Sequence, residues 1–220
     1  MQRKVIDTGD GSKTLFIPEM DEQYHSVNGA RTESEYVFLE KGYLHHASKS
    51  PVIFEVGFGT GLNALLTALQ AENQKRPTTY ISIEKYPIKE NEIAELNYGA
   101  MISDKAINLF SAIHKAPWGT TIKISEYFNL LKIEGDLSKY EFDLPQKFDI
   151  IYFDAFGPDK QPTMWNSQIF QKIFDASAND SVFVTYSAKG VIRRQLRDCG
   201  YLMERLPGPP GKRQMLRGTK

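Results

Sequence analysis

The chain has 220 residues with a formal net charge of zero, and hydrophobic residues make up 41% of it. This composition is typical of a globular protein with an ordinary core and excludes a fibrous or intrinsically disordered one. No apolar run approaches the ~20 residues that a membrane helix needs, and the N-terminal stretch "MQRKVIDTGDGSK" lacks the apolar centre of a signal peptide. We therefore expect a cytoplasmic protein without membrane association.

The cysteine and histidine content argues against a metal protein. A single cysteine, Cys199, excludes an intrachain disulfide, which agrees with a reducing compartment. A lone cysteine without clustered histidines is not the pattern of a structural zinc site. His45 and His46 are adjacent, and neighbours in sequence rarely share a metal on a helix. We expect no bound metal.

The charges are unevenly placed along the chain. Residues 186–220 hold nine Lys/Arg against two acidic residues, a net charge of +7, so residues 1–185 carry −7. This asymmetry indicates either a polyanionic partner for the C-terminal part or a basic solvated face. Composition alone leaves both interpretations open.

Hydrophobic periodicity and turn residues predict a regular series of elements. In chain order they are a hairpin over 4–17 with a turn at 9–11, an amphipathic helix over 32–47, a strand over 52–56, a helix over 62–73, a strand over 78–84, helices over 88–97 and 104–116, a strand or strand pair within 121–136, a strand over 148–156, a helix over 164–177, a strand over 181–187, a helix over 190–200, and two closing strands around a corner at 207–211. The helix over 32–47 opens with a capping-box pattern, Thr32 or Ser34 followed by Glu35.

Strands that alternate with helices of about ten residues predict βαβ units and a parallel sheet. We expect one doubly wound, Rossmann-like α/β domain over residues 51–220. Residues 1–50 are expected to form a hairpin-and-helix extension packed on that core.

A glycine turn follows the first strand of the expected domain. In "EVGFGTG" (55–61), Glu55 is followed by Gly57, Gly59 and Gly61, and such glycines let a ligand lie against the main chain. The dinucleotide fingerprint is G-x-G-x-x-G, and a pyrophosphate at a helix N-terminus would not favour a nearby carboxylate. An acid suits a ligand with a cationic amino group, so the turn favours S-adenosylmethionine over NAD.

Two further acids extend the expected cofactor site. Glu84 ends the second strand, 23 residues after Gly61, where an acid commonly takes ribose hydroxyls. Tyr86 beside it could cover the adenine face, although Glu84 alone could also be an exposed strand-end acid. Asp136 either binds the adenine amino group or caps the turn that follows it.

The strand over 148–156 predicts the acceptor side. Asp154 follows an apolar run, so its carboxylate is expected at the carboxyl edge of the sheet, where it could hold an ammonium and accept its proton. Phe156 and Trp165 are flat apolar side chains on which a base could stack. Trp165 could equally be a core residue.

Four stretches resemble the S-adenosylmethionine-dependent methyltransferase half of the MnmC family. They are "YHSVNGARTESEYVFLEKG" (24–42), "FEVGFGTGLNAL" (54–65), "FDAFGPDKQPTMW" (153–165), and "TYSAKGVIRRQLRDCGY" together with "GKRQMLRG" (185–218). The glycine motif is shared by many methyltransferases, whereas "DAFGPDKQPTMW" and "GKRQML" are specific to this group. The resemblance implies a class I methyltransferase fold and S-adenosyl-L-methionine as cofactor.

The resemblance also implies the reaction and its partners. The acceptor in that family is the aminomethyl group of the wobble uridine in tRNA, converted from 5-aminomethyl-2-thiouridine to 5-methylaminomethyl-2-thiouridine. Glu55, Gly57, Gly59 and Glu84 carry over as cofactor contacts, and Asp154 stands where the family has its base-side Asp. Fused members continue into a flavin oxidoreductase domain that this chain ends before, so a separate flavin-dependent enzyme is expected to supply the acceptor.

The basic residues of the C-terminal part are candidates for contacts with tRNA phosphates. They are Arg193, Arg194, Arg197, Lys212 and Arg213.

Two departures limit the resemblance. Gly157 stands where Ala or Ser is common, and the segment 122–142 matches only loosely, which places Asp136 in more doubt than Asp154.

Two other functions compete with tRNA methylation. An aminopropyltransferase of the spermidine synthase type needs a second acid shortly after the first, and here Asp159 follows Pro158 instead. A non-catalytic RNA-binding module would use the basic residues without binding S-adenosylmethionine.

Overall fold

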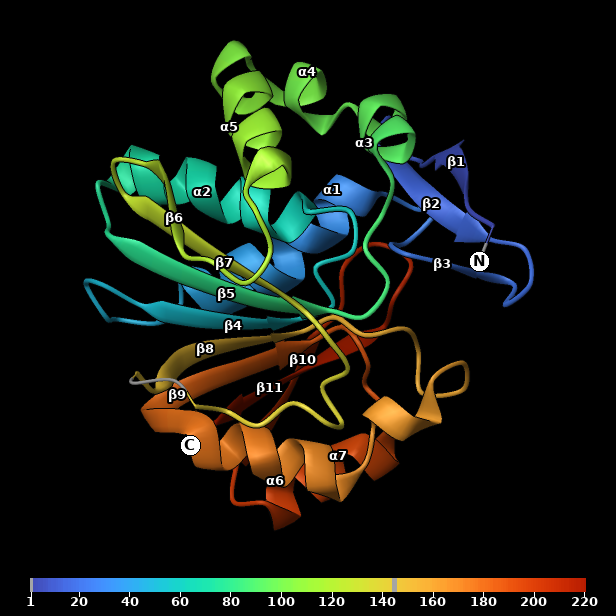
Figure 1. Ribbon diagram of the computed structural model, residues 1–220. Helices are drawn as coiled ribbons and strands as arrows, with labels where there is room; N and C mark the ends of the chain where they lie inside the picture. Colours follow the sequence, from blue (N-terminus) through green and yellow to red (C-terminus); the bar gives the residue numbers. More distant parts are fainter. Residues whose placement is uncertain (1, 144–145) are drawn as a thin grey trace.

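The computed structural model describes residues 2–143 and 146–220, and its strands form two sheets (Figure 1). The smaller sheet consists of β1 (Lys4–Asp7), β2 (Lys13–Ile17) and β3 (Glu22–Gln23). The larger sheet consists, in spatial order, of β10 (Leu202–Pro207), β11 (Gln214–Thr219), β9 (Ser177–Thr185), β8 (Phe148–Phe153), β4 (Val52–Val56), β5 (Thr78–Glu84), β7 (Phe128–Glu134) and β6 (Ile122–Ser125).

Strand β4 lies at the centre of the larger sheet, parallel to β5 on one side and to β8 on the other. All five of its residues are buried, as expected for a strand that is covered on both faces. Strands β7 and β9 continue the parallel arrangement outward, while β6 and β11 pair antiparallel at the two sides. The carboxyl ends of β4, β5 and β8 therefore meet at one edge, where doubly wound sheets bind ligands.

Helices cover both faces of the larger sheet (Figure 1). They are, in chain order, α1 (Ala30–Ser34), the π-helix η1 (Glu35–Tyr43), α2 (Leu62–Gln74), α3 (Glu90–Leu96), α4 (Tyr98–Ile102), α5 (Asp104–Lys115), the 3-10 turn η2 (Pro162–Met164), α6 (Ser167–Ala176) and α7 (Gly190–Asp198). The first three, together with α5, lie on one face, and α6 and α7 lie on the other. Within the described residues, no helix is long and apolar enough to cross a membrane.

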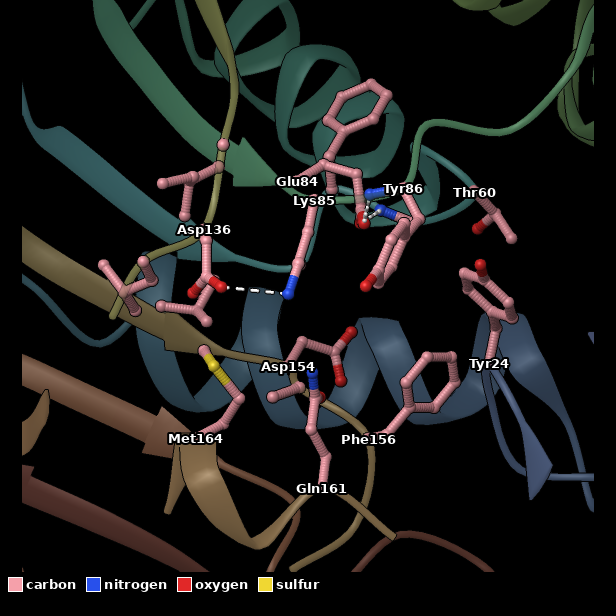
Figure 2. Close-up of a pocket in the computed structure, with 18 of the residues that line it drawn as sticks. Tyr24, Thr60, Glu84, Lys85, Tyr86, Asp136, Asp154, Phe156, Gln161 and Met164 are labelled. Atoms are coloured by element: carbon pink, nitrogen blue, oxygen red, sulfur yellow. Dashed lines mark hydrogen bonds and ion pairs between the residues drawn. The ribbon is translucent and has the colours of Figure 1, made fainter. Parts of the chain in front are cut away.

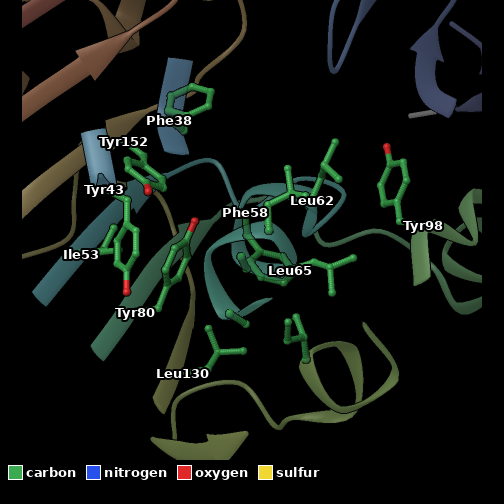
Figure 3. Close-up of a cluster of buried hydrophobic side chains, with 14 of the residues drawn as sticks. Phe38, Tyr43, Ile53, Phe58, Leu62, Leu65, Tyr80, Tyr98, Leu130 and Tyr152 are labelled. Carbon is green, nitrogen blue, oxygen red and sulfur yellow. The ribbon is translucent and has the colours of Figure 1, made fainter. Parts of the chain in front are cut away.

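Each face has its own hydrophobic core. The core under α2 and α5 contains a group of fully buried tyrosines, Tyr43, Tyr80 and Tyr152, shown together in Figure 3. Rings of Tyr80 and Tyr152 meet edge to face at 6.0 Å between centroids, a favourable geometry for aromatic pairs. The core under α6 and α7 includes Phe153 and Phe183, whose rings stack. The sheet is thus held from both sides, which fixes the strand ends that carry the site.

The N-terminal extension contacts the larger sheet and its surroundings at several places, of which two bear on the site. Helix η1 packs on α2, β8 and β9, and its Phe38 belongs to the same core as Tyr152. Arg3, just before β1, donates hydrogen bonds to the hydroxyl of Tyr24 (2.9 Å) and to the main-chain carbonyl of Tyr86 (2.6 Å). The hairpin is therefore fastened to the loop that follows β5.

The expected alternation of strands and helices is confirmed, and most bounds differ by one to four residues. The segment within 121–136 forms a strand pair, and two closing strands flank the corner near 207–211. The sequence did not indicate β3 or α4. The capping-box prediction at Thr32 or Ser34 is wrong: the helix begins at Ala30, and its N-cap is Gly29, which has no side chain to cap it. Its first amides instead donate to Thr8, Ser12 and Asp10 of the hairpin turn.

Arg76 closes the end of η1 and gives a test of how firmly the extension is held. Its guanidinium donates to the carbonyls of Tyr43 (2.8 Å), His46 (2.7 Å) and Ser48 (2.8 Å). Replacing it with methionine removes these charged hydrogen bonds while keeping an unbranched side chain, so Arg76→Met should lower the free energy of unfolding by about 2 kcal/mol. Urea unfolding measures the change, and Lys49→Met, an exposed position nearby, is the control. Equal stability of the two variants would contradict this role.

Candidate active site

A cavity of about 310 Å³ opens at the carboxyl edge of the larger sheet (Figure 2). Its wall is formed by the turn from β4 to α2, by the residues that follow β5, β7 and β8, and by Tyr24 and His25 from the N-terminal extension. In Figure 2, the Tyr24 and Phe156 rings lie at one end of the cavity, and Lys85 and Asp136 lie at the other. The Asp154 carboxylate points into the space between them.

The glycine turn brings main chain directly to the cavity wall. Gly57 has φ +89° and Gly59 has φ +51°, conformations that favour glycine. The Gly57 N–H donates to the carbonyl of Ile83 at 3.0 Å, and a Cβ on Gly57 would come within 2.7 Å of the Asp154 carbonyl oxygen. The turn therefore lies against the ends of both β5 and β8, and both glycines line the cavity.

Glu84 is held in place at the end of β5 by two main-chain amides. Its Oε2 accepts from the Gly59 N–H at 3.0 Å, and its Oε1 accepts from the Tyr86 N–H at 2.8 Å. A carboxylate has about four acceptor sites, so Glu84 can still accept hydrogen bonds from a pair of hydroxyls. Both Glu84 and Tyr86 line the cavity.

Asp136 also lines the cavity, at the end away from Tyr24. The Ser138 hydroxyl donates to it at 2.7 Å and the Lys85 ammonium lies 2.9 Å from its other oxygen, so these groups lower the pKa of Asp136 to about 2. Asp136 is thus an anion with a fixed cation beside it. The sequence analysis did not identify Lys85.

Asp154 lies on the other side of the glycine turn. Asn63 of α2 donates its amide N–H to Oδ2 of Asp154 at 2.9 Å. Burial raises the pKa of the Asp154 carboxyl to about 7, and the charge of Glu33 adds to this, while Asn63 and the charge of Lys212 oppose it. A carboxyl with a pKa near neutrality can both hold and release a proton under working conditions.

Glu55 does not reach the cavity. Its side chain is 0% exposed, and its carboxyl lies beneath the glycine turn, where it accepts from Asn63 at 3.0 Å and meets the Ser82 hydroxyl at 2.7 Å. The expected direct contact between Glu55 and the cofactor is therefore revised. Glu55 is the fourth of five buried residues of β4, and Asn63, which also bonds Asp154, lies between its carboxyl and that of Asp154.

Gly61 and Trp165 are also placed behind the cavity wall. Gly61 is the N-cap of α2 with φ +73°, and a Cβ there would lie 2.9 Å from Nε2 of His114. The Trp165 ring is 4% exposed and packs on Phe153, while its Nε1–H donates to the carbonyl of Phe156 at 2.7 Å. Trp165 thus holds the main chain of Phe156, which does line the cavity, and the core interpretation of Trp165 applies.

Three further side chains at the cavity were missed from the sequence. Tyr24 meets Phe156 edge to face at 4.9 Å, and Gln161 extends toward Asp154 in Figure 2. Asn63 contacts both Glu55 and Asp154. Asn63 could have been found, because it follows the glycine turn directly in "GTGLN". Tyr24 could not, because its place depends on how the extension packs.

The basic residues of the C-terminal part do not form one surface. Those on α7 line a second cavity of about 210 Å³ and are Arg193, Arg194 and Arg197. Lys212 instead lies 2.5 Å from the buried carboxyl of Glu33 and over the Tyr186 ring, 3.8 Å from its centre. Arg213 is exposed in the turn between β10 and β11. Of the five residues, the three arginines of α7 thus lie together, apart from Lys212 and Arg213.

The residues of the main cavity fit a cofactor that carries an adenosine and an amino acid. The main chain of Gly57 and Gly59 forms part of its wall, and the carboxylates of Glu84 and Asp136 also line it. In the described part of the chain, no group of three or more His, Cys, Asp or Glu side chains is arranged to hold a metal ion.

The strand order, with an antiparallel β11 inserted between β9 and β10, and the glycine turn after the central strand define a class I S-adenosylmethionine-dependent methyltransferase. The chain belongs to a family described as S-adenosyl-L-methionine-dependent methyltransferases, whose model matches residues 105–220. The cofactor of this enzyme is accordingly S-adenosyl-L-methionine. The matched part includes Asp136 and Asp154, whereas the glycine turn precedes it.

Named relatives align over nearly the whole chain. A protein of Pseudoalteromonas atlantica named tRNA 5-methylaminomethyl-2-thiouridine biosynthesis bifunctional protein MnmC is 32% identical, over 93% of this chain and 32% of its own length. A protein of the same name from Burkholderia vietnamiensis is 30% identical, over 93% of this chain and 33% of its own length. The chain thus spans about a third of the length of these relatives.

Solved structures agree with the fold. The crystal structure of MnmC2 from Aquifex aeolicus superposes with a TM-score of 0.76 and 26% identity, over 99% of this chain and 70% of that one. Spermidine synthase from Thermotoga maritima superposes with a TM-score of 0.58 and 13% identity, over 100% of this chain and 72% of that one, which shows a shared fold alone.

The glycine turn gives a test of the cofactor site. A Cβ on Gly59 would lie 3.1 Å from the Tyr24 ring, and the residue has a left-handed φ. Gly59→Ala should therefore weaken S-adenosyl-L-methionine binding at least tenfold, a loss of ~1.4 kcal/mol, measured by calorimetry. Gly119→Ala is the matched control, since Gly119 also has a positive φ (+77°) but nothing within 4 Å of an added Cβ. Equal affinities of the two variants would remove the glycine turn from the cofactor site.

Proposed function

We propose that this enzyme N-methylates the aminomethyl group on the wobble uridine of tRNA, converting 5-aminomethyl-2-thiouridine to 5-methylaminomethyl-2-thiouridine. The observation that carries the proposal is Asp154, a carboxyl with a raised pKa that points into the cavity beside the glycine turn. The names of the relatives and of the superposed MnmC2 structure support the same reaction.

The acceptor chemistry explains why a carboxylate is needed. A primary amine is mostly an ammonium at neutral pH and has no lone pair for attack until it loses a proton. Asp154 holds the ammonium as an ion pair and accepts that proton at its carboxylate. Because burial, with a smaller contribution from Glu33, raises the pKa of Asp154 to about 7, Asp154 is a better proton acceptor than an exposed aspartate.

The proton and electron count balances in two steps. The ammonium first gives one proton to Asp154 and becomes a neutral amine. S-adenosyl-L-methionine held by the glycine turn would supply the methyl group: the amine nitrogen would bond to the methyl carbon as the carbon–sulfur bond breaks and its electron pair remains on sulfur. The product is a secondary ammonium, so the positive charge moves from sulfur to nitrogen. The part of the protein is to align the two atoms and hold the proton.

The aromatic end of the cavity is assigned to the uridine. Tyr24 and Phe156 form an edge-to-face pair there, and the Arg3 guanidinium fixes the Tyr24 hydroxyl. An unstacked base from a single-stranded anticodon loop binds between aromatic rings in many RNA-binding sites. Gln161 is placed to bond a base edge, since its amide offers both a donor and an acceptor.

The opposite end is assigned to the cofactor. Gly57 and Gly59 leave room for its methionine part against the main chain, and Glu84 accepts from the ribose hydroxyls. Tyr86 covers the adenine face, and Asp136 receives the adenine amino group. With this assignment, Gly57 and Gly59 would hold the part of the cofactor that supplies the methyl group, and Asp154 would hold the acceptor.

The alternative of aminopropyl transfer finds less support. A polyamine substrate would need a second acid near Asp154, and Asp159 is exposed and forms an ion pair with Lys189 on the surface. Membership of a methyltransferase family also disfavours a purely RNA-binding role. The proposal includes a flavin-dependent oxidoreductase that supplies the aminomethyl acceptor, in agreement with the word bifunctional in the relatives' names, and a cytoplasmic site of action.

Asp154→Asn tests the proposed proton acceptor. The variant keeps the size of the side chain and loses its charge and basicity, so the rate of methylation of 5-aminomethyluridine tRNA at pH 7 should fall about 10²-fold or more. The loss should shrink as pH rises, because solvent then deprotonates the amine. Cofactor affinity should remain. Asp159→Asn, on the same loop but exposed, is the control, and a normal rate for Asp154→Asn at pH 7 would make Asp154 a structural acid.

Salt dependence tests the proposed contact between α7 and tRNA. Replacing Arg193 and Arg194 with glutamine should weaken tRNA binding, and the slope of log K against log salt should flatten by about 0.7–0.9 for each lost phosphate contact. Lys115→Gln with Lys123→Gln is the matched control, since it removes two charges at the opposite edge of the sheet. If both double variants behave alike, the arginines of α7 form only a solvated surface.

A further inference from the structure

Two carboxyl groups at the site are joined by one amide nitrogen. Nδ2 of Asn63 donates to Oε1 of Glu55 at 3.0 Å and to Oδ2 of Asp154 at 2.9 Å. The two carboxyl oxygens are therefore no more than about 6 Å apart, without bulk water on the Glu55 side. Two such groups titrate as a pair, because ionising one disfavours ionisation of the other.

The surroundings of the two carboxyls are unequal. Glu55 is 0% exposed on β4, next to the fully buried Tyr80 of β5 and Tyr152 of β8. Its other oxygen, Oε2, lies 2.7 Å from the Ser82 hydroxyl. Among the described residues, no Lys, Arg or His side chain forms an ion pair with Glu55. An unpaired buried carboxylate is costly, and a protonated carboxyl is the usual outcome.

Asp154, in contrast, faces the cavity and has charged groups around it. Glu33 of α1 disfavours its charge, and Lys212 from the turn between β10 and β11 favours it. Burial and, after it, the charge of Asp154 raise the pKa of Tyr186, which follows β9. Lys212 lies 2.5 Å from Glu33, so its charge offsets part of the effect of Glu33 on Asp154. Asp154 is the member of the pair that can ionise.

We propose that Glu55 is an uncharged positioning residue: it keeps its proton in the working enzyme and, through Asn63, fixes Asp154 as the only anion of the pair. In the structure, Oε2 accepts from the Ser82 hydroxyl at 2.7 Å and Oε1 accepts from Asn63 at 3.0 Å. With the proton on Oε2, the Ser82 hydroxyl donates instead to the main-chain carbonyl of Glu55, 3.5 Å away, and Ser82 Oγ accepts from Oε2. Burial raises the pKa of Glu55 to about 8 and that of Asp154 to about 7. Asp154 therefore ionises before Glu55, in agreement with the unequal surroundings. The functional part of this inference rests on the proposed role of Asp154.

An uncharged Glu55 suits the proposed proton transfer. A second anion under the cavity floor would stabilise the acceptor as an ammonium and oppose its deprotonation. A neutral carboxyl still accepts from Asn63 and orients it, through a weaker hydrogen bond than a carboxylate would form, and it adds no negative charge under the cavity. The Asn63 amide then has its donors directed at both carboxyls, so the Asp154 side chain is held at one angle toward the acceptor.

The first experiment needs no substrate. If Glu55 is protonated in the folded chain and ionised in the unfolded chain, the unfolded state binds fewer protons between pH 4.5 and 8, and stability falls as pH rises through that window. In Glu55→Gln this contribution disappears. Between pH 5 and 7, the ratio of the wild-type unfolding constant to that of Glu55→Gln should therefore increase about tenfold for each pH unit.

Denaturant unfolding at several pH values provides these constants. Glu134→Gln, an exposed carboxyl at the end of β7, is the control and should keep the wild-type slope. Parallel slopes for the wild type and Glu55→Gln would mean that Glu55 is ionised in the folded chain, and the inference would be overturned. This measurement does not use the methylation reaction, so it tests the protonation of Glu55 even if the proposed function is wrong.

The second experiment reads the positioning role through methylation. Glu55→Leu, which cannot accept from Asn63, should lower kcat about tenfold or more with a small change in the KM for the cofactor, and Glu55→Gln should recover most of that loss. The pH midpoint of the acid limb of kcat should be the same in Glu55→Gln and the wild type. A midpoint lower by a full pH unit would show that Glu55 is charged, and a cofactor affinity reduced tenfold would show a direct contact. Either result overturns the inference.

A third measurement applies if Glu55→Gln does not fold. In Asp154→Asn at pH 6.5, exposed carboxyls are ionised, so a protonated-carboxyl band in the infrared spectrum reports Glu55. Its presence supports the inference, and its absence overturns it.

Discussion

The site depends on one close approach of main chain at the centre of the sheet. The Gly57 N–H donates to the carbonyl of Ile83 at the end of β5, and the Asp154 N–H donates to the carbonyl of Val56 at the end of β4 at 3.0 Å. No side chain fits between Gly57 and the Asp154 carbonyl. This contact sets the distance between the turn assigned to the methyl donor and the carboxylate assigned to the acceptor. Because both are held by strand hydrogen bonds and by packed layers on each face, the geometry is built before any ligand binds.

Three carboxyl groups near this packed centre differ in how deeply they are buried. Glu84 is fixed by amides at the rim, Asp154 has one amide donor and the cavity in front of it, and Glu55 lies fully inside. The three carboxyls thus differ in access to water by position along the strands, although each ends or nearly ends a strand. Such a gradient lets one residue type serve as a hydrogen-bond acceptor, a proton acceptor and an internal support.

The strands and helices of residues 51–220 were predictable because strands buried on both faces read as apolar runs and the intervening helices have their own periodicity. Asp154 was predictable for the same reason, since an acid directly after such a run must emerge at the sheet edge. The burial of Glu55 was not, because it depends on partners eight and 27 residues away, Asn63 and Ser82. The helix start at Ala30 also differed, because Gly29 rather than a hydroxyl side chain precedes it.

The Arg3–Tyr24 hydrogen bond makes the N-terminal extension part of the wall rather than an appendage. A chain trimmed at residue 50 would lose the ring that faces Phe156, the tether on the Tyr86 loop and Glu33, the partner of Lys212. Ligand binding and docking of the hairpin are therefore linked equilibria, and each should favour the other. It follows that a ligand in the cavity should slow amide exchange in β1 and β2, two strands that do not line the cavity.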